Sequence, residues 1–285
     1  MRPTRTTASI ALAALTLQAT PSGAGEFKQF HRDVKLDRSL QERANDGAGV
    51  RVAVVDTDID LEHREFRDRI VAVVKHPDYA YADPGDHGTW VTGIIAAARD
   101  GRGMVGMAPE ARIISTWLLD DDGATSYDGP GGSLADWFTR ARRNKANVLN
   151  ASIGPISGGC VLHCDDGLKA LAKLSGSAVV AVAAGNEGVR LRDVRCRSGN
   201  RRLCRHPEEH FGNLLIVGAV DRDGELAGFS NRPGAACFER QGDGTCASRH
   251  RLRRWFLVAP GTEVRGRCRG TSTGAEAAPR RRPPS

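Results

Sequence analysis

The sequence predicts a three-layer α/β fold, in which a mostly parallel central sheet carries helices on both faces. Two observations support this: seven short apolar runs have the composition of buried strands, and longer amphipathic segments lie between several of them. A chain of 285 residues can bury one large core, and no internal repeat divides it. The strand-like runs are 51–55, 70–74, 111–118, 147–152, 178–184, 214–220 and 255–259.

Helical patterns cover 88–98, 132–143 and 166–174. The residues predicted to share the apolar faces of the second and third helices are Leu134, Trp137, Phe138, Ala141, Leu168, Leu171 and Leu174. Two further segments, 190–210 and 231–254, carry cysteine pairs and many arginines, and we predict that they are surface loops.

The N-terminus has the pattern of a secretory signal peptide. Arg2 and Arg5 precede the apolar segment 9–17, and small residues follow up to Ala24, where we expect cleavage. No other apolar run reaches membrane-spanning length. The predicted organisation is therefore a signal peptide at 1–24 and an N-terminal extension at 25–47, with a mature chain that is secreted or periplasmic and not membrane-bound.

Export makes the seven cysteines candidates for disulfides. Cys268 is left over, and the other six fall into close sequence pairs that we expect to be bonded: Cys160 with Cys164, Cys196 with Cys204, and Cys237 with Cys246. The stretch C160-V-L-H-C164 has ligand types for zinc but not a recurrent zinc spacing, so no metal is predicted.

The net charge of +7 does not indicate a nucleic-acid partner, because it is concentrated at one end. Residues 249–285 hold ten arginines and two glutamates, a surplus of eight, which leaves about −1 for the rest of the chain. This segment has neither interleaved aromatic residues nor a recognised binding motif.

Three aspartates follow the first strand-like run, and they allow three interpretations. An EF-hand loop would need Gly and Glu where the chain has Leu61 and Arg67. A phosphatase of the haloacid dehalogenase type places D-x-D after such a strand, but here Asp60 replaces the usual Thr or Val. The third interpretation makes Asp56 the partner of a catalytic histidine, with Asp58 and Asp60 as solvated turn residues.

Three later segments supply the residues that the third interpretation needs. His87 begins the helical stretch H87-G-T-W-V-T-G-I-I-A-A97, and Asn186 follows a predicted buried strand in A181-V-A-A-G-N-E-G188. Ser272 ends G270-T-S272. Each segment is weak evidence alone, but together they give the chain order Asp, His, Asn, Ser.

This order and the surrounding motifs resemble the subtilisin-like serine proteases, or subtilases. The resemblance covers about 48–273, and 216–220 with 226–232 are most similar to autotransporter-type subtilases of Gram-negative bacteria. The matching motifs are V-V-D-T at Asp56, H-G-T-x-V-T-G-I-I-A at His87, G103-M-V-G-M-A-P109, V148-L-N-A-S-I-G154, A-A-G-N-E-G at Asn186, A259-P-G261 and G-T-S at Ser272.

The resemblance implies a secreted serine endopeptidase that acts on polypeptides and needs no cofactor. Ser272 would attack the peptide carbonyl, His87 would transfer the proton, and Asp56 would orient His87. The amide of Asn186 would stabilise the oxyanion. The residues that the resemblance places beside the primary side-chain pocket are Ser152, Ile153, Gly154, Ala183, Ala184 and Gly185.

Two departures from the family pattern affect this expectation. Asp58 stands where the family usually has Gly, and a second carboxylate near His87 would raise the pKa of the histidine. After Ser272, an Arg/Pro-rich tail, 274–285, replaces the long buried helix of the family. We therefore expect a truncated or frame-shifted end that lacks the C-terminal helices, with weak peptidase activity. The alternative is a subtilase-like secreted protein that is non-catalytic or damaged.

Overall fold

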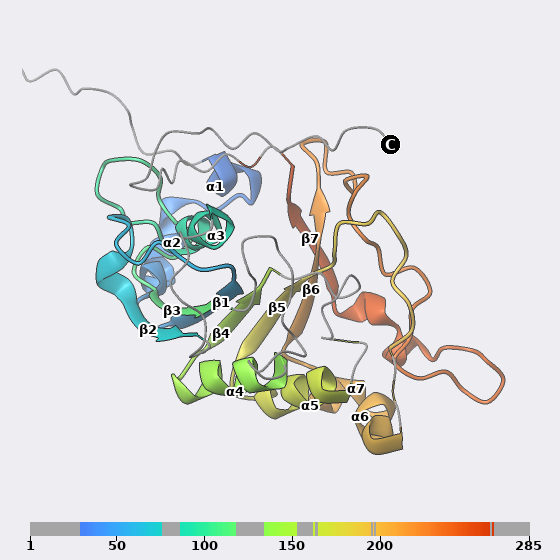
Figure 1. The fold of residues 1–285 in the computed structure, drawn as a ribbon. Helices are drawn as coiled ribbons and strands as arrows, with labels where there is room; N and C mark the ends of the chain where they lie inside the picture. The colour runs from blue at the N-terminus through green and yellow to red at the C-terminus, as the bar shows by residue number, and fades with distance from the viewer. Residues whose placement is uncertain are drawn as a thin grey trace, which may run out of the picture.

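The computed structural model describes residues 29–75, 86–117, 134–152, 162, 165–194, 196, 198–262 and 264. Seven strands form one sheet in the order β2-β3-β1-β4-β5-β6-β7, and every neighbouring pair is parallel (Figure 1). The strands are β1 (Arg51–Asp56), β2 (Ile70–Val74), β3 (Arg112–Trp117), β4 (Val148–Ala151), β5 (Val179–Ala183), β6 (Leu214–Val220) and β7 (Phe256–Pro260).

Strand β1 lies in the interior of the sheet, between β3 and β4. All of its residues after Arg51 are buried, including the consecutive Val54 and Val55 that point to opposite faces. A strand covered on both faces needs apolar side chains at successive positions, which explains why the sequence shows a continuous apolar run here rather than an alternation.

Helices cover both faces of the sheet (Figure 1). On one face, α3 (Asp86–Ala96) packs against Val52, Val54 and Ile113. On the other, α4 (Leu134–Arg143) and α5 (Asp165–Leu174) pack against the opposite side chains of the strands. The predicted three-layer α/β fold is thus confirmed. The described side chains of both predicted helical faces are buried: Trp137, Phe138, Ala141, Leu168, Leu171 and Leu174.

Two short helices, α1 (Gln29–Asp33) and α2 (Arg38–Arg43), precede β1 and pack on the α3 side. Phe30 of α1 is buried with Ala97 and Met104. From α2, the buried Gln41 amide donates hydrogen bonds to the carbonyls of Gly106 and Met107, at 3.2 and 3.1 Å. The first described residues therefore contribute to the packing of the domain.

The prediction that 190–210 and 231–254 are surface loops is wrong, because both segments contribute buried residues to the main hydrophobic core. They contain α6 (Arg201–Arg205), α7 (Pro207–His210) and the short 3₁₀ turns η3 (Ser198–Asn200), η4 (Ser248–His250) and η5 (Leu252–Arg254). Two further 3₁₀ turns lie earlier in the chain, η1 (Asn45–Gly47) and η2 (Arg67–Arg69). Phe238 stacks on Phe211 with ring centroids 5.1 Å apart, and both rings are buried. The two segments have few aromatic residues among many arginines, so their sequence shows no apolar periodicity that would predict burial.

Two of the three predicted disulfides are present, Cys196–Cys204 and Cys237–Cys246. The remaining cysteines, at 160, 164 and 268, lie outside the described residues. In the part of the chain that the structure describes, no helix combines the length and apolar character needed to cross a membrane.

Candidate active site

The candidate site begins with Asp56, the last residue of β1. Its side chain is fully buried, and Oδ1 accepts a hydrogen bond of 2.8 Å from the backbone N–H of Thr57. The other oxygen, Oδ2, is buried without a hydrogen-bond partner among the described residues. A buried carboxylate at the carboxyl end of an interior strand is fixed in place by the sheet, and ligands of open α/β sheets bind at that edge.

His87 is the second residue of α3, and its Nδ1 lies 2.6 Å from Oδ1 of Asp56. The aspartate oxygen accepts the Nδ1 proton, which leaves Nε2 as the nitrogen able to take a proton from another group. The His87 side chain is 52% exposed, whereas that of Asp56 is 0% exposed. The pair therefore consists of a buried carboxylate and an accessible imidazole.

Glycine at position 88 permits this contact. A Cβ at Gly88 would lie 2.5 Å from the carbonyl oxygen of Thr57 and 2.7 Å from that of Asp58. The Gly88 N–H also donates to Oγ1 of Thr57 at 2.9 Å. One turn of backbone after β1 and the first turn of α3 are thus in direct contact, and this contact sets the distance between Asp56 and His87.

The Asp56 carboxylate raises the pKa of His87 above its usual value, mainly through the hydrogen bond and also through its charge. Burial of the ring acts in the opposite direction and does not outweigh the carboxylate. The arrangement thus favours the imidazolium that forms when His87 takes up a proton.

The description of Asp58 and Asp60 as solvated turn residues was wrong, because each is only 6% exposed. The turn that follows β1 packs under α3, where the N–H of Asp60 donates to Oγ1 of Thr89 at 2.9 Å. Oδ1 of Asp60 accepts from the N–H of Glu62 at 3.0 Å, so Asp60 stabilises the turn. A short turn between packed elements can be polar and still be buried, so composition alone does not distinguish a buried turn from a solvated one.

Asn186 lies in the loop that follows β5, two strands away from β1 in the sheet. Its side chain is exposed and makes no hydrogen bond with the residues that the structure describes. Gly185, just before it, is buried and has a φ of +99°, a left-handed conformation that glycine adopts without strain. The loop therefore presents an exposed amide group directly after a constrained glycine.

The other predicted site residues fall partly within the described chain. Ser152 follows β4, between β1 and β5, and its Oγ accepts from Nδ2 of Asn150 at 2.9 Å. The short segment Ala183, Ala184 and Gly185 leaves β5 at the same edge of the sheet. Ser272, Ile153 and Gly154 lie outside the described residues, so the nucleophile and part of the proposed pocket are not placed.

Two residues near the site were not assigned a role from the sequence, namely Thr57 and Asn231. Thr57 belongs to the V-V-D-T motif, and its hydroxyl accepts the hydrogen bond from Gly88 described above. Asn231 is fully buried and bonds to the loop around Asn186. Only its place in the stretch A-G-F-S-N-R pointed to it, and that stretch gives no chemistry by itself.

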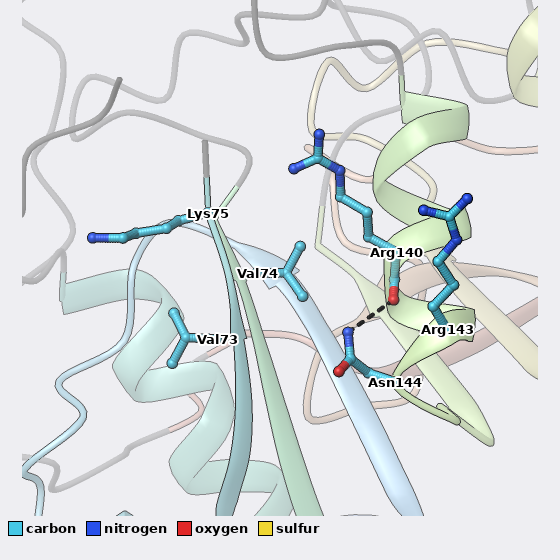
Figure 2. Close-up of a pocket in the computed structure, with 6 residues that line it drawn as sticks. All are labelled: Val73, Val74, Lys75, Arg140, Arg143 and Asn144. Atoms are coloured by element: carbon cyan, nitrogen blue, oxygen red, sulfur yellow. Dashed lines mark hydrogen bonds between the residues drawn. The ribbon is translucent and has the colours of Figure 1, made fainter. Parts of the chain in front are cut away.

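A separate hollow of about 250 Å³ lies between β2 and α4 (Figure 2) and contains none of the predicted site residues. Its lining residues are Val73, Val74, Lys75, Arg140, Arg143 and Asn144. Lys75 and Arg140 lie over the rings of Trp117 and Trp137, with 5.6 and 5.2 Å to the ring centroids. Figure 2 shows Lys75 directed away from the two arginines, so the cations do not converge on a ligand.

The described residues contain no group of three His, Cys, Asp or Glu side chains arranged to hold a metal ion.

The family model that matches this chain describes the subtilase family and covers residues 47–281. Subtilisin E of Bacillus subtilis (strain 168) is 30% identical over 215 residues, which is 75% of this chain and 50% of that protein. The thermophilic serine proteinase of Bacillus sp. (strain AK1) is 34% identical over 190 residues, covering 65% of this chain and 41% of that protein. The chain thus spans half or less of the length of these two relatives.

Solved structures agree on the fold. The Prenylagaramide maturation protease PagA superposes with a TM-score of 0.56 at 22% identity, covering 80% of this chain and 69% of that chain. The Patellamide maturation protease PatA gives a TM-score of 0.53 at 23% identity over 77% of this chain and 68% of that chain. With the matching family model, the shared sheet and the sequence relatives, this chain belongs to the subtilase family.

Proposed function

We propose that this protein is a serine endopeptidase in which Asp56, His87 and Ser272 form the catalytic triad. The observation that carries the proposal is the 2.6 Å hydrogen bond from His87 Nδ1 to Asp56 Oδ1, with the histidine accessible and the aspartate buried. Nε2 of His87 then takes the proton from the Ser272 hydroxyl as it attacks a peptide carbonyl, and returns it to the leaving amine.

The developing oxyanion is stabilised by the amide of Asn186 and by the backbone N–H of Ser272. The side chain of Asn186 is exposed and has no hydrogen-bond partner within the described part of the chain, which supports this role, since a donor already bonded to the protein could not serve it. An extended polypeptide substrate lies beside Ser152–Gly154 and Ala183–Gly185, where the small side chains leave room for a substrate side chain.

We further propose that the protein acts outside the cytoplasm, after cleavage of the segment 1–24. The two disulfides, Cys196–Cys204 and Cys237–Cys246, support an oxidising compartment. Mass mapping of the unreduced, exported protein tests this: both bonds and a new N-terminus near residue 25 are expected. Reduced thiols at all four positions with an intact N-terminus would contradict it.

The experiment that tests the catalytic proposal uses a fluorophosphonate probe, which reacts with activated serines. The purified 285-residue chain is labelled beside Ser272→Ala and His87→Ala variants, and casein cleavage is measured in parallel. Labelling confined to Ser272 and dependent on His87 supports the triad. A folded chain with no labelling and no cleavage would instead support the alternative, a subtilase-like protein that does not catalyse; the atypical sequence after Ser272 is the reason to test it.

A further inference from the structure

We infer that Asn231 is a positioning residue for Asn186, which it holds in place by binding the loop on both sides of it. This inference deepens the proposed function and rests on the assignment of Asn186 as the oxyanion donor. Asn231 touches neither substrate nor the reacting atoms in this proposal. It acts through four hydrogen bonds to the backbone and side chains of residues 184–189.

Before Asn186, Asn231 bonds to two successive residues. Its Nδ2 donates to the carbonyl oxygen of Ala184 at 3.0 Å, and its backbone N–H donates to the carbonyl oxygen of Gly185 at 3.0 Å. These bonds hold the chain as it leaves β5 and enters the left-handed conformation at Gly185.

After Asn186, the same side chain bonds to two more residues. Nδ2 donates to Oε2 of Glu187, and Oδ1 accepts from the N–H of Val189 at 2.9 Å. Every polar group of the Asn231 side chain therefore binds the loop, and none binds Asn186. Asn231 therefore leaves the amide of Asn186 available to a ligand while it fixes the residues on either side.

Asn231 is itself held rigidly. It is 0% exposed, and the preceding Ser230 is 1% exposed. The Ser230 hydroxyl accepts from the N–H of Ala219 in β6 at 2.9 Å and donates to the carbonyl of Asn231 at 3.1 Å. Ser230 therefore links Asn231 to strand β6 by hydrogen bonds, and Asn231 in turn links the loop to the sheet.

The space around Gly185 agrees with this role. A Cβ at Gly185 would lie 2.5 Å from Nδ2 of Asn231, so only glycine fits here. After Asn186, backbone hydrogen bonds also join the loop to the segment that contains Asn231. The N–H of Gly188 donates to the carbonyl of Phe229 at 2.7 Å, and that of Arg232 donates to the carbonyl of Val189 at 3.0 Å. A donor that stabilises a transition state must be held within roughly 0.5 Å, and this packed arrangement gives such support.

The test is a double-mutant cycle with Asn186→Ala, Asn231→Ala and the combined variant, measured as kcat and KM on a peptide substrate. Removing an oxyanion donor is expected to lower kcat by roughly 10²- to 10³-fold. We expect Asn231→Ala to lower kcat by about 10-fold or more with little change in KM, because the donor is misplaced only for the transition state. In the Asn186→Ala background the same substitution should have almost no further effect on kcat.

The matched control is Asn200→Ala. Asn200 is also buried, at 1% exposed, and its Nδ2 donates to the carbonyl and carboxylate oxygens of Asp165 on α5, away from the loop. This variant should lose stability without the selective loss of kcat. Equal kcat for Asn231→Ala and the wild type would overturn the inference, and so would a full additional loss in the Asn186→Ala background.

Hydrogen exchange keeps the inference testable apart from the proposed function. If the wild-type chain or the Asn186→Ala variant shows that Asn186 is not an oxyanion donor, the proposed function fails, but the loop can still be measured. Faster exchange of the 185–189 amides in a folded Asn231→Ala variant, with 112–117 still protected, supports positioning by Asn231. Unchanged exchange in that loop would rule it out. If the alanine variant does not fold, an Asn231→Asp variant replaces the donor with an oxygen that faces the Glu187 carboxylate and the Ala184 carbonyl, and it should likewise speed exchange in this loop.

Discussion

A single hydrogen bond, from His87 to the buried carboxylate of Asp56, determines how the proposed site should respond to pH. The carboxylate raises the pKa of His87, and only the unprotonated imidazole can act as a base. Activity should therefore rise with pH through the raised His87 pKa, so its acid limb lies above the position expected for an ordinary histidine.

The Asp56→Asn variant tests this relation. Loss of the orienting carboxylate should lower kcat/KM by about 10⁴-fold and move the remaining acid limb to lower pH. The measurement is a pH profile of kcat/KM for both proteins. A variant that loses activity but keeps the wild-type acid limb would mean that Asp56 is not the group that raises the His87 pKa.

Glu65 is a second buried carboxyl group, and it should limit stability rather than support activity. It is 1% exposed, its Oε2 has no hydrogen-bond partner among the described residues, and its pKa is raised first by burial and then by the charge of Asp100. A raised native pKa means that the stabilising contribution is complete below the unfolded pKa and is lost as pH rises through the native value.

We predict that Glu65→Gln increases the free energy of unfolding by about 1 kcal/mol at about pH 8 and has little effect near pH 4. Thermal unfolding at both pH values measures this. Glu62→Gln is the matched control, because it removes the same charge at an exposed position three residues away. A stability gain in Glu62→Gln as large as in Glu65→Gln would refute burial as the cause.

At the scale of elements, the contact between the turn after β1 and the start of α3 decides whether Asp56 and His87 meet. Gly88→Ala places a Cβ against the carbonyl oxygens of Thr57 and Asp58, at 2.5 and 2.7 Å, and backbone atoms cannot turn aside as a side chain can. We predict a loss of about 1–3 kcal/mol in the free energy of unfolding and a loss of activity beyond that explained by unfolding.

Gly199→Ala is the control for the glycine substitution, since a Cβ there meets nothing within 4 Å. Denaturant unfolding gives the stability of both variants, and fluorophosphonate labelling of the folded fraction gives the state of the site. Normal labelling of folded Gly88→Ala would show that α3 can shift without separating His87 from Asp56.

The sequence predicted the elements well where one physical requirement dominates. Interior strands such as β1 and β6 must be apolar on both faces, and the helical face of Leu168, Leu171 and Leu174 follows from its period. Burial at 190–210 and 231–254 was missed because it depends on pairs such as Phe211 and Phe238, which meet only in the folded chain. Asn231 was missed for the same reason, because its bonds join segments that are far apart in the sequence.

At the scale of the whole molecule, the candidate site assembles from segments that are distant in sequence. Asp56 and His87 are 31 residues apart, and Asn231 lies 44 residues from Glu187 and 47 from Ala184. The proposed chemistry follows from the motif order, because each motif can be recognised within a short stretch of sequence. The motif order could not predict the hydrogen bonds from Asn231 to the loop around Asn186. These bonds depend on the sheet order β2-β3-β1-β4-β5-β6-β7, which places β5 and β6 next to each other and so brings the two segments together.

The parallel pairing of all seven strands also determines when the candidate site forms during folding. Each strand pairs with a neighbour only after a long crossover has closed, so the ordering entropy is lost before the contacts that compensate for it are made. Refolding from denaturant should therefore be slow for a domain of this size, and activity should return with the last kinetic phase rather than with early helix formation. Stopped-flow circular dichroism beside fluorophosphonate labelling at timed intervals would show this separation, and labelling that appears with the first helical signal would contradict it. Until the sheet closes, Asp56 and His87 are present in the chain but are not yet in contact, so any activity of the proposed site depends on the completed fold.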